Sequence, residues 1–133
     1  MTTENRWLLP EGIEELLPER ASQLEALRRR LLDQCGTWGY RYVIPPLVEF
    51  TDSLLIGLGA DLDVVTCKFT DQMSGRMLGV RADITPQAAR MDAHSLAEKG
   101  VTRLGYAGST LQSTPQSVIG GRAPIQLGAE LFG

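Results

Sequence analysis

The sequence has 133 residues, of which 43% are hydrophobic and 22% are charged. These values are those of an ordinary globular domain and exclude a disordered or fibrous chain. The 13 basic and 16 acidic residues give a net charge of -3, so no nucleic acid is expected as a partner. Cys35 and Cys67 lie among apolar neighbours and are expected to be buried, reduced thiols of a cytoplasmic protein.

The sequence contains no targeting signal. Its first residues lack the basic and apolar regions of a secretory signal. The longest uncharged apolar run, 54–60, is much shorter than the roughly 20 residues that a membrane span needs. We therefore expect a cytoplasmic location and no membrane. Because the chain stops at Gly133 within a predicted strand, we expect it to be part of a longer chain.

The first predicted element is a helix from Leu16 to Cys35. Pro18 suits its first turn and Gly36 ends it. Its apolar face carries residues spaced by three and four, namely Ala21, Leu24, Leu27 or Leu31, and Cys35. The basic run 28–30 is expected on the opposite face as a solvated surface, with a phosphate or RNA contact as the less favoured alternative.

The later elements follow from local signals. Pro45 stops a strand because proline lacks the ladder donor, Thr51 suits an N-cap, and Thr85 followed by Pro86 suits a helix start. The turn-prone segment 71–75 joins the strands of a hairpin. The predicted elements are strand 40–44, helix 51–58, strands 64–70 and 76–81, helix 85–99, and strands 101–111 and 124–132. Without a repeated βαβ rhythm, we expect an α+β fold with a mixed, mainly antiparallel sheet flanked by helices.

The last strand has one polar face. Gln126, Gly128 and Glu130 share that face, and the other carries Ile125, Leu127, Ala129 and Leu131. The glycine is expected to leave room above the sheet. An amide and a carboxylate that flank such a gap suit a small ligand with an ammonium group. The alternative, which the pattern alone favours, is an ordinary strand whose polar face is its outer face.

Asp83 and Thr85 form a second candidate, because they lie at a strand-to-helix turn where binding residues often gather. Asp83 suits helix capping equally well. A third feature is the segment 104–121, which has no charged residue and cannot clamp a triphosphate by ion pairing. His94 has no Cys or His companions, and phosphate-binding glycine motifs are missing, so neither a metal nor a cofactor is expected.

Several segments resemble class II aminoacyl-tRNA synthetases. Residues 38–50 resemble motif 1, a helix and strand ending in proline at the dimer interface. Residues 9–12 and 81–85 resemble the start and the histidine-holding Arg-Pro-Glu-Gly-Thr segment of histidyl-tRNA synthetases, and residues 126–133 resemble the strand that closes motif 2. The resemblance covers essentially the whole chain. It implies that residues 1–133 are the N-terminal portion of a class II synthetase-like catalytic-type domain.

The sequence departs from active synthetases in motif 2. Where they carry Phe-Arg-x-Glu, residues 111–114 read Leu-Gln-Ser-Thr, and no arginine or acid lies between Arg103 and Arg122. Losing the arginine that grips the ATP α-phosphate should lower the rate by a factor on the order of 10²–10³ or more. This combination resembles the regulatory subunits of ATP phosphoribosyltransferase, catalytically inactive paralogues in bacterial histidine biosynthesis.

This resemblance implies a non-catalytic subunit required for the first step of histidine biosynthesis and for its feedback regulation by histidine. The implied partners are the catalytic ATP phosphoribosyltransferase subunit in a hetero-oligomer, and a second copy through the motif 1 region. The implied histidine-binding residues are Asp83 and Glu130 for the ammonium group, Thr85 and Gln126 for the polar wall, and Gln112 for a neutral contact with the carboxylate. Two alternatives stay open: the N-terminal fragment of an active histidyl-tRNA synthetase, and a dimerisation module without a ligand.

Overall fold

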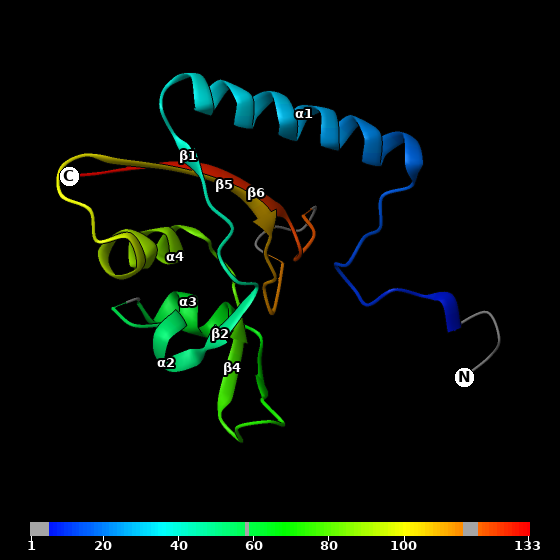
Figure 1. Cartoon of the computed structure of the whole chain (residues 1–133). Coiled ribbons are helices and arrows are strands. Elements are labelled where there is room, and N and C mark those ends of the chain that lie inside the picture. The colour runs from blue at the N-terminus through cyan, green and yellow to red at the C-terminus, as the bar shows by residue number, and fades with distance from the viewer. Residues whose placement is uncertain (1–5, 58, 116–119) are drawn as a thin grey trace.

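The computed structural model describes residues 6–57, 59–115 and 120–133. Its elements are α1 (Pro18–Thr37), β1 (Arg41–Tyr42), β2 (Val48–Phe50), α2 (Thr51–Leu54), α3 (Ala60–Val65), β3 (Lys68–Thr70), β4 (Met77–Val80), α4 (Thr85–Arg90), the π-helical turn η2 (Met91–Leu96), β5 (Thr102–Ser109) and β6 (Ile125–Phe132) (Figure 1). They build two three-stranded sheets, in the orders β1-β5-β6 and β2-β4-β3. Only the β1–β5 pair is parallel among these strands, so the predicted mixed, mainly antiparallel α+β fold is confirmed.

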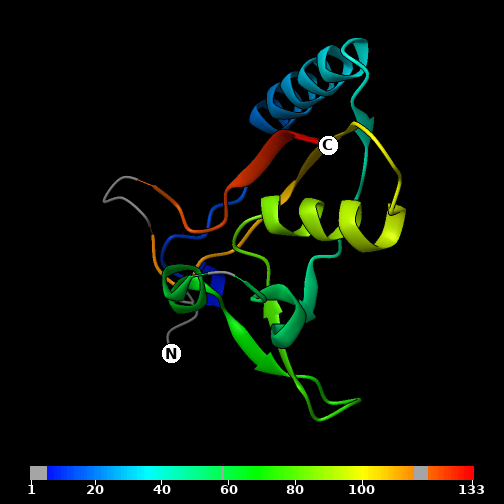
Figure 2. The same ribbon diagram turned by 90° about the vertical axis from the view of Figure 1, so that its left-hand side faces the viewer.

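Helices α1 and α4 lie on opposite faces of the first sheet, as both ribbon views show (Figures 1 and 2). The buried core lies on the α4 side, where Ile84 and Ala88 pack against Tyr106 of β5. Val43 and Phe132 pack against the same cluster. The core therefore joins the beginning of α4 to the strands that carry the candidate site.

One face of the second sheet is covered by α2 and α3. A Cβ added at Gly79 of β4 would lie 2.9 Å from Leu54 Cδ2 and 3.0 Å from Thr66 Cγ2. Only glycine allows these helices to approach the strand so closely. Of these elements, α3 forms one wall of the cavity described below.

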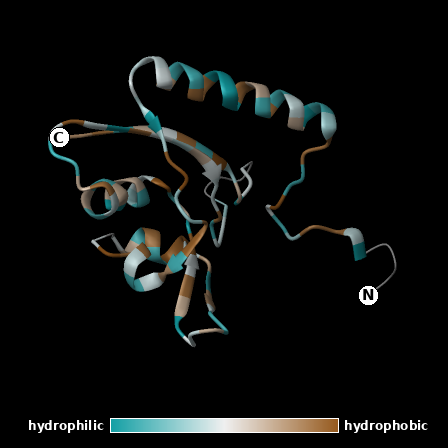
Figure 3. Cartoon of the chain, in the orientation of Figure 1, coloured by the Kyte–Doolittle hydropathy of each residue, from teal (hydrophilic) through white to brown (hydrophobic). Residues whose placement is uncertain are grey.

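The stripe of α1 that faces the sheet differs from the expected one. The half-buried residues are Ala21, Leu24, Arg28, Leu32 and Cys35, whereas Leu27 and Leu31 are 50% and 42% exposed. The half-buried positions thus keep the spacing of 3.6 residues per turn, and one of them is Arg28. Its aliphatic stem packs while its guanidinium group reaches a partner. Figure 3 shows hydrophilic and hydrophobic residues mixed along this helix.

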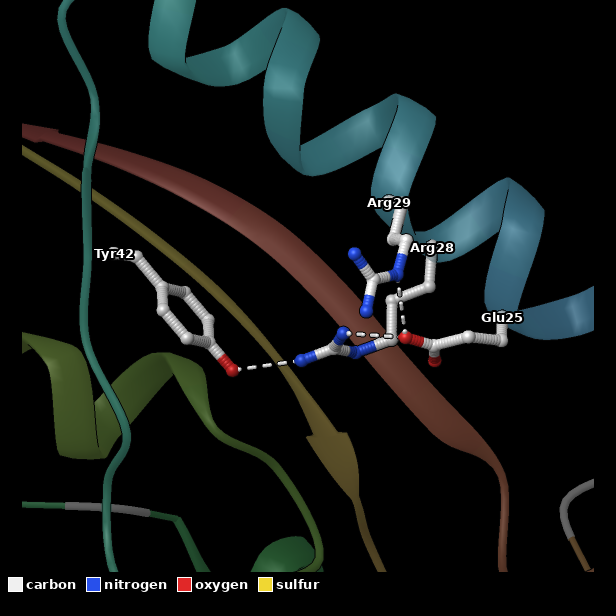
Figure 4. Close-up of polar contacts among 4 residues, drawn as sticks. All are labelled: Glu25, Arg28, Arg29 and Tyr42. Carbon is white, nitrogen blue, oxygen red and sulfur yellow. Dashed lines mark hydrogen bonds and ion pairs between the residues drawn. The ribbon is translucent and has the colours of Figure 1, made fainter.

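Arg28 consequently does not lie on the solvated face that the sequence predicted for the basic run. Its Nη2 donates to Tyr42 Oη at 2.9 Å and its Nη1 to Glu25 Oε1 at 3.3 Å (Figure 4). Arg29, whose side chain is 75% exposed, donates to the same Glu25 oxygen at 3.2 Å. Arg28 therefore links α1 to β1 by a hydrogen bond. The expectation that the basic run faces solvent was wrong for this residue.

The other predicted elements are found in part. The strand expected over 40–44 is only Arg41–Tyr42, β2 was not expected as a strand of its own, and the helix expected over 51–58 ends at Leu54. Thr51 is not the N-cap of α2, since Phe50 takes that position and the Thr51 hydroxyl donates to the Met77 carbonyl at 3.4 Å; Leu58 lies outside the described residues. Val64 and Val65 end α3 instead of starting a strand, because Thr66 N donates to Asp63 O and closes the helix.

A further difference concerns the helix expected over 85–99. It has Ile84, not Thr85, as its N-cap residue and ends at η2, where Ala97 adopts a left-handed φ of 49°. Cys35 and Cys67 are free but only half-buried, so their expected full burial was wrong. Within the described residues, no helix has the length and apolar run that a membrane crossing requires.

Candidate functional site

The polar face of β6 points toward α4, into the fold. Side chains alternate along a strand, so Gln126, Gly128 and Glu130 share the α4 side of the sheet with their cross-strand partners in β5. Gln126 and Glu130 are half-buried, while Ile125 and Leu131 of the opposite face are 47% and 61% exposed. The interpretation of this face as an ordinary polar outer face is therefore wrong.

The space above Gly128 is filled. Gly128 is paired directly with Tyr106 of β5, and a Cβ added to it would lie 2.5 Å from Tyr106 Cζ and 2.9 Å from Cε2. The phenol ring, only 2% exposed, therefore occupies the position that the sequence left to a ligand. The glycine makes room for a side chain of the protein itself.

The Tyr106 hydroxyl connects two of the predicted residues. It donates to Glu130 Oε1 at 2.9 Å and lies 3.0 Å from Thr85 Oγ1. Since an ionised carboxylate only accepts hydrogen bonds, the Thr85 hydroxyl donates to Tyr106, which donates to Glu130. Burial raises the pKa of Tyr106 to about 12, with the Thr85 hydrogen bond opposing the rise and the Glu130 carboxylate adding to it. The phenol therefore stays protonated as a donor at neutral pH.

Asp83 and Gln126 form the other pair. Asp83 Oδ1 accepts from Gln126 Nε2 at 2.8 Å and from the Thr85 backbone N–H at 3.0 Å, and Gln126 Oε1 accepts from Ile84 N at 2.7 Å. Asp83 thus satisfies an N–H of the first turn of α4, as the capping alternative predicted. The same bonds fix the rotamers of both side chains at the edge of a cavity.

That cavity has a volume of about 850 Å³, within the range of small-molecule sites. Asp83, Gln112 and Gln126 line it, together with α3 and the residues before β6. Asp61 contributes a second carboxylate, and no Lys or Arg is found among the described residues that line it. The cavity can accept a cationic or neutral polar ligand and has no counter-charge for a polyphosphate.

The structure brings the five predicted residues together only in part. Thr85 and Glu130 do not line the cavity and connect with each other through Tyr106. Sequence reasoning missed Tyr106 and Asp61. Tyr106 lies in a strand whose sequence is typical of a buried core, and only its pairing with Gly128 shows that it contacts the candidate residues. Asp61 has no sequence feature other than its charge that would mark it as a site residue.

Two arginines hold the backbone around the cavity without lining it. Arg81, 6% exposed, donates from Nε to Ser109 O at 2.7 Å and from Nη1 to Pro45 O at 2.8 Å, and burial lowers its pKa. Arg122 donates from Nε to Glu11 O at 3.0 Å, and its carbonyl accepts from Gln112 N at 2.7 Å. Both guanidinium groups thus stabilise the backbone through hydrogen bonds to carbonyl groups.

Comparison with known proteins shows the family of the chain. The family model for histidyl-tRNA synthetase matches residues 12–133. The chain is 62% identical to a protein of Teredinibacter turnerae over its whole length and 61% identical to one of Alkalilimnicola ehrlichii over 98% of it; both are named ATP phosphoribosyltransferase regulatory subunit. It covers 34% and 32% of these proteins, so it spans about a third of the length of the curated relatives it matches.

Solved structures show the same fold. One is described as an ATP phosphoribosyltransferase regulatory subunit/histidyl-tRNA synthetase from Bacillus halodurans, with a TM-score of 0.81 and 26% identity over 98% of this chain and 33% of that one. The histidyl-tRNA synthetase of S. aureus superimposes with a TM-score of 0.71 over 92% of this chain and 28% of that one, at 20% identity. The predicted resemblance to synthetase-like regulatory subunits is thus confirmed, and the chain belongs to the histidyl-tRNA synthetase family.

Proposed function

We propose that this chain is the N-terminal portion of a non-catalytic, cytoplasmic regulatory subunit of ATP phosphoribosyltransferase. The subunit would be required for the first step of histidine biosynthesis and for its feedback regulation by histidine. The names of relatives at 56–62% identity over the whole chain support this proposal. The family model alone leaves an active synthetase as the competing function.

The observation that carries the non-catalytic part of the proposal is the charge of the cavity. Asp61 and Asp83 give it two carboxylates, and Gln112 occupies the position where the resemblance expects the ATP-binding arginine. A triphosphate bound there would meet negative charge without a compensating cation, which raises its free energy in the partly desolvated cavity. The lining thus favours an amino acid over ATP.

Histidine is the proposed effector. The cavity-lining residues carry this proposal: Asp83 binds the ammonium group, Gln126 forms the polar wall and Gln112 contacts the carboxylate. The resemblance adds Glu130 to the ammonium contact and Thr85 to the polar wall, but neither residue lines the cavity. The hydrogen bonds that fix Asp83 and Gln126 support the role of this pair, because groups held in one rotamer lose little entropy when they bind. The cavity beside them has room for an amino acid.

The proposed partners are the catalytic subunit in a hetero-oligomer and a second copy of this chain through the motif 1 region. Large apolar side chains are exposed on α1 and along the following segment, which supports the second contact. They are Leu27, Leu31, Trp38 and Ile44, with exposed fractions of 50%, 42%, 70% and 77%. An exposed apolar group of this kind is typical of an interface.

The test is co-purification of the full-length subunit with a short-form catalytic ATP phosphoribosyltransferase, followed by activity assays with and without histidine. We expect a complex whose activity depends on the subunit and falls when histidine is added. Histidine-dependent pyrophosphate exchange by the subunit alone would identify an active synthetase instead. No heat in a calorimetric titration with millimolar histidine would leave only the dimerisation module.

A further inference from the structure

Arg122 is a half-buried charged residue that the proposed histidine site does not yet use. Its Nε donates to Glu11 O at 3.0 Å and its Nη1 donates to Ser113 O at 3.2 Å. We propose that Arg122 is a positioning residue for Gln112 and couples the N-terminal turn, residues 10–13, to the part of the cavity that contacts the ligand's carboxylate. This inference rests on the proposed function, because it assigns a role within the same site.

The N-terminal turn is attached to Arg122 through two hydrogen bonds. Ile13 N donates to Pro10 O at 3.0 Å and closes the turn, and Arg122 N donates to Gly12 O at 2.9 Å. The guanidinium adds the bond to Glu11, which lies 111 positions earlier in the sequence. Both ribbon views show this N-terminal segment, in blue, beside the orange segment that leads into β6 (Figures 1 and 2).

The same arginine holds the backbone on either side of the Gln112 side chain. Gln112 N donates to Arg122 O at 2.7 Å, and the carbonyl of Ser113 accepts from the guanidinium. Ser113 N in turn donates to Val65 O at 2.7 Å, at the end of α3. Residues 112 and 113 therefore lie between Arg122 and α3, and these bonds fix where Gln112 enters the cavity.

This attachment matters because the three polar residues of the proposed site are held in different ways. Asp83 and Gln126 are fixed by a hydrogen bond between their own side chains, whereas Gln112 is fixed through its backbone. A hydrogen bond from an amide to a carboxylate weakens steeply when its distance or angle changes. Arg122 does not line the cavity, so it acts on a ligand through Gln112 and not by direct contact.

Two glycines allow the N-terminal turn to approach Arg122. Gly12 has a left-handed φ of 79°, and a Cβ added there would lie 3.1 Å from Arg122 Cγ. A Cβ added at Gly121 would lie 3.1 Å from Gly12 O. A side chain at position 12 would therefore push against Arg122, although Gly12 itself does not line the proposed histidine cavity.

The test measures two affinities of the full-length subunit by calorimetry: that of histidine, and that of histamine, which lacks the carboxylate. Arg122→Ala removes both side-chain bonds. We expect it to weaken histidine binding about tenfold, as for the loss of a hydrogen bond to a charged group, and to leave the histamine affinity unchanged. Arg122→Lys should show the same selective loss, because an ammonium group keeps the charge but lacks the planar fork that reaches both carbonyls.

A double-mutant cycle tests whether Arg122 acts through Gln112. In the background of Gln112→Ala, Arg122→Ala should have no further effect on histidine binding. Additive losses would contradict the proposed coupling between the two residues.

A remote variant keeps the test independent of the folding of the Arg122 variants. Gly12→Ala should lower histidine affinity selectively, since its methyl group displaces Arg122. Gly75→Ala is the matched control: Gly75 has a similar φ of 75°, but no atom lies within 4 Å of the added Cβ. It introduces the same backbone strain in the hairpin and should leave both affinities unchanged. Equal histidine affinity of Gly12→Ala and Gly75→Ala would contradict the role of the N-terminal turn.

Three further results would overturn the inference. Equal histidine affinity of wild type and Arg122→Ala would show that the arginine does not act on the ligand. An equal loss for histidine and histamine would assign Arg122 to the general stability of the fold. Full affinity of Arg122→Lys beside a loss in Arg122→Ala would mean that the charge acts and not the hydrogen-bonded position. Absence of histidine binding by the wild-type protein would instead refute the proposed function, and this inference with it.

Discussion

The guanidinium of Arg81 donates to the carbonyl of Pro45 at 2.8 Å, and this hydrogen bond joins the end of β4 to the segment between β1 and β2. The same side chain reaches Ser109 O at 2.7 Å, at the end of β5. Arg81 is therefore a buried link between the two sheets. Asp83 follows Arg81 by two residues in the sequence, so this link also fixes one side of the candidate site.

Arg81→Lys should destabilise the protein by about 2–3 kcal/mol, because an ammonium group cannot reach both carbonyls and leaves one of them buried and unpaired. The measurement is the free energy of unfolding in urea. Arg29→Lys is the matched control: its side chain is 75% exposed, and the same change there should stay within about 0.5 kcal/mol. Equal effects of the two substitutions would contradict a structural role for Arg81.

Two glycines should respond to alanine with opposite signs. At Gly79 the new methyl group meets Leu54 and Thr66 within 3.0 Å, so we expect Gly79→Ala to cost about 1–3 kcal/mol of unfolding free energy. Gly36 lies inside α1 with no atom within 4 Å of the added Cβ. Gly36→Ala should stabilise by up to about 1 kcal/mol, because alanine loses less backbone entropy in a helix. Thermal or urea unfolding of both variants checks the signs.

The pKa of Tyr106 predicts a specific loss of stability at alkaline pH. Its folded-state pKa of about 12 exceeds the ordinary tyrosine pKa of 10.0, so the protonated phenol is favoured by the folded state. The resulting stability is fully present below pH 10 and declines between pH 10 and 12, by about 1.4 kcal/mol at pH 11.

The control for this prediction is Tyr106→Phe, which lacks the titrating group and keeps every other one. The difference in unfolding free energy between wild type and variant should be constant from pH 8 to 9.5 and should fall toward pH 11. A difference that stays constant up to pH 11 would mean that burial does not hold the phenol in its protonated form.

Elements with strong local signals were predictable from the sequence. The helix α1, the hairpin around residues 71–75 and the strands β5 and β6 follow from periodicity, proline and turn residues that act over a few positions. The stripe of α1 that faces the sheet was not predictable in full, because the partner of Arg28 is Tyr42, which lies on the next strand. Val64 and Val65 were misassigned because β-branched residues favour strands, whereas here the capping of α3 prevails.

The candidate site was predictable to a similar extent. The polar residue types pointed to Asp83 and Gln126, the resemblance pointed to Gln112, and all three line one cavity. The filled space above Gly128 could not be deduced, because it depends on the register of two strands separated by 15 intervening residues, from 110 to 124. A one-residue shift of that register would turn Tyr106 to the opposite face of the sheet. The pairing of residues far apart in the sequence therefore decides whether the space above Gly128 is open to a ligand or filled by a side chain.

The end of η2 offers a prediction about backbone strain. Ala97 adopts a left-handed φ of 49°, in which its Cβ crowds the following carbonyl, at a cost of roughly 1–2 kcal/mol. Ala97→Gly should therefore stabilise the protein by up to about 1 kcal/mol, since glycine adopts this conformation without a steric penalty but loses more entropy on folding.

The matched control is Ala93→Gly, four residues earlier and inside the π-helical turn. The same change there should destabilise by about 0.5–1 kcal/mol, because no strain is relieved and only the entropy loss remains. Unfolding free energies measured in urea distinguish the two signs. Destabilisation by both substitutions would mean that Ala97 stores no strain in this conformation. The turn would then be held by the surrounding contacts, among them the ion pair between Arg41 and Glu98 at 2.6 Å.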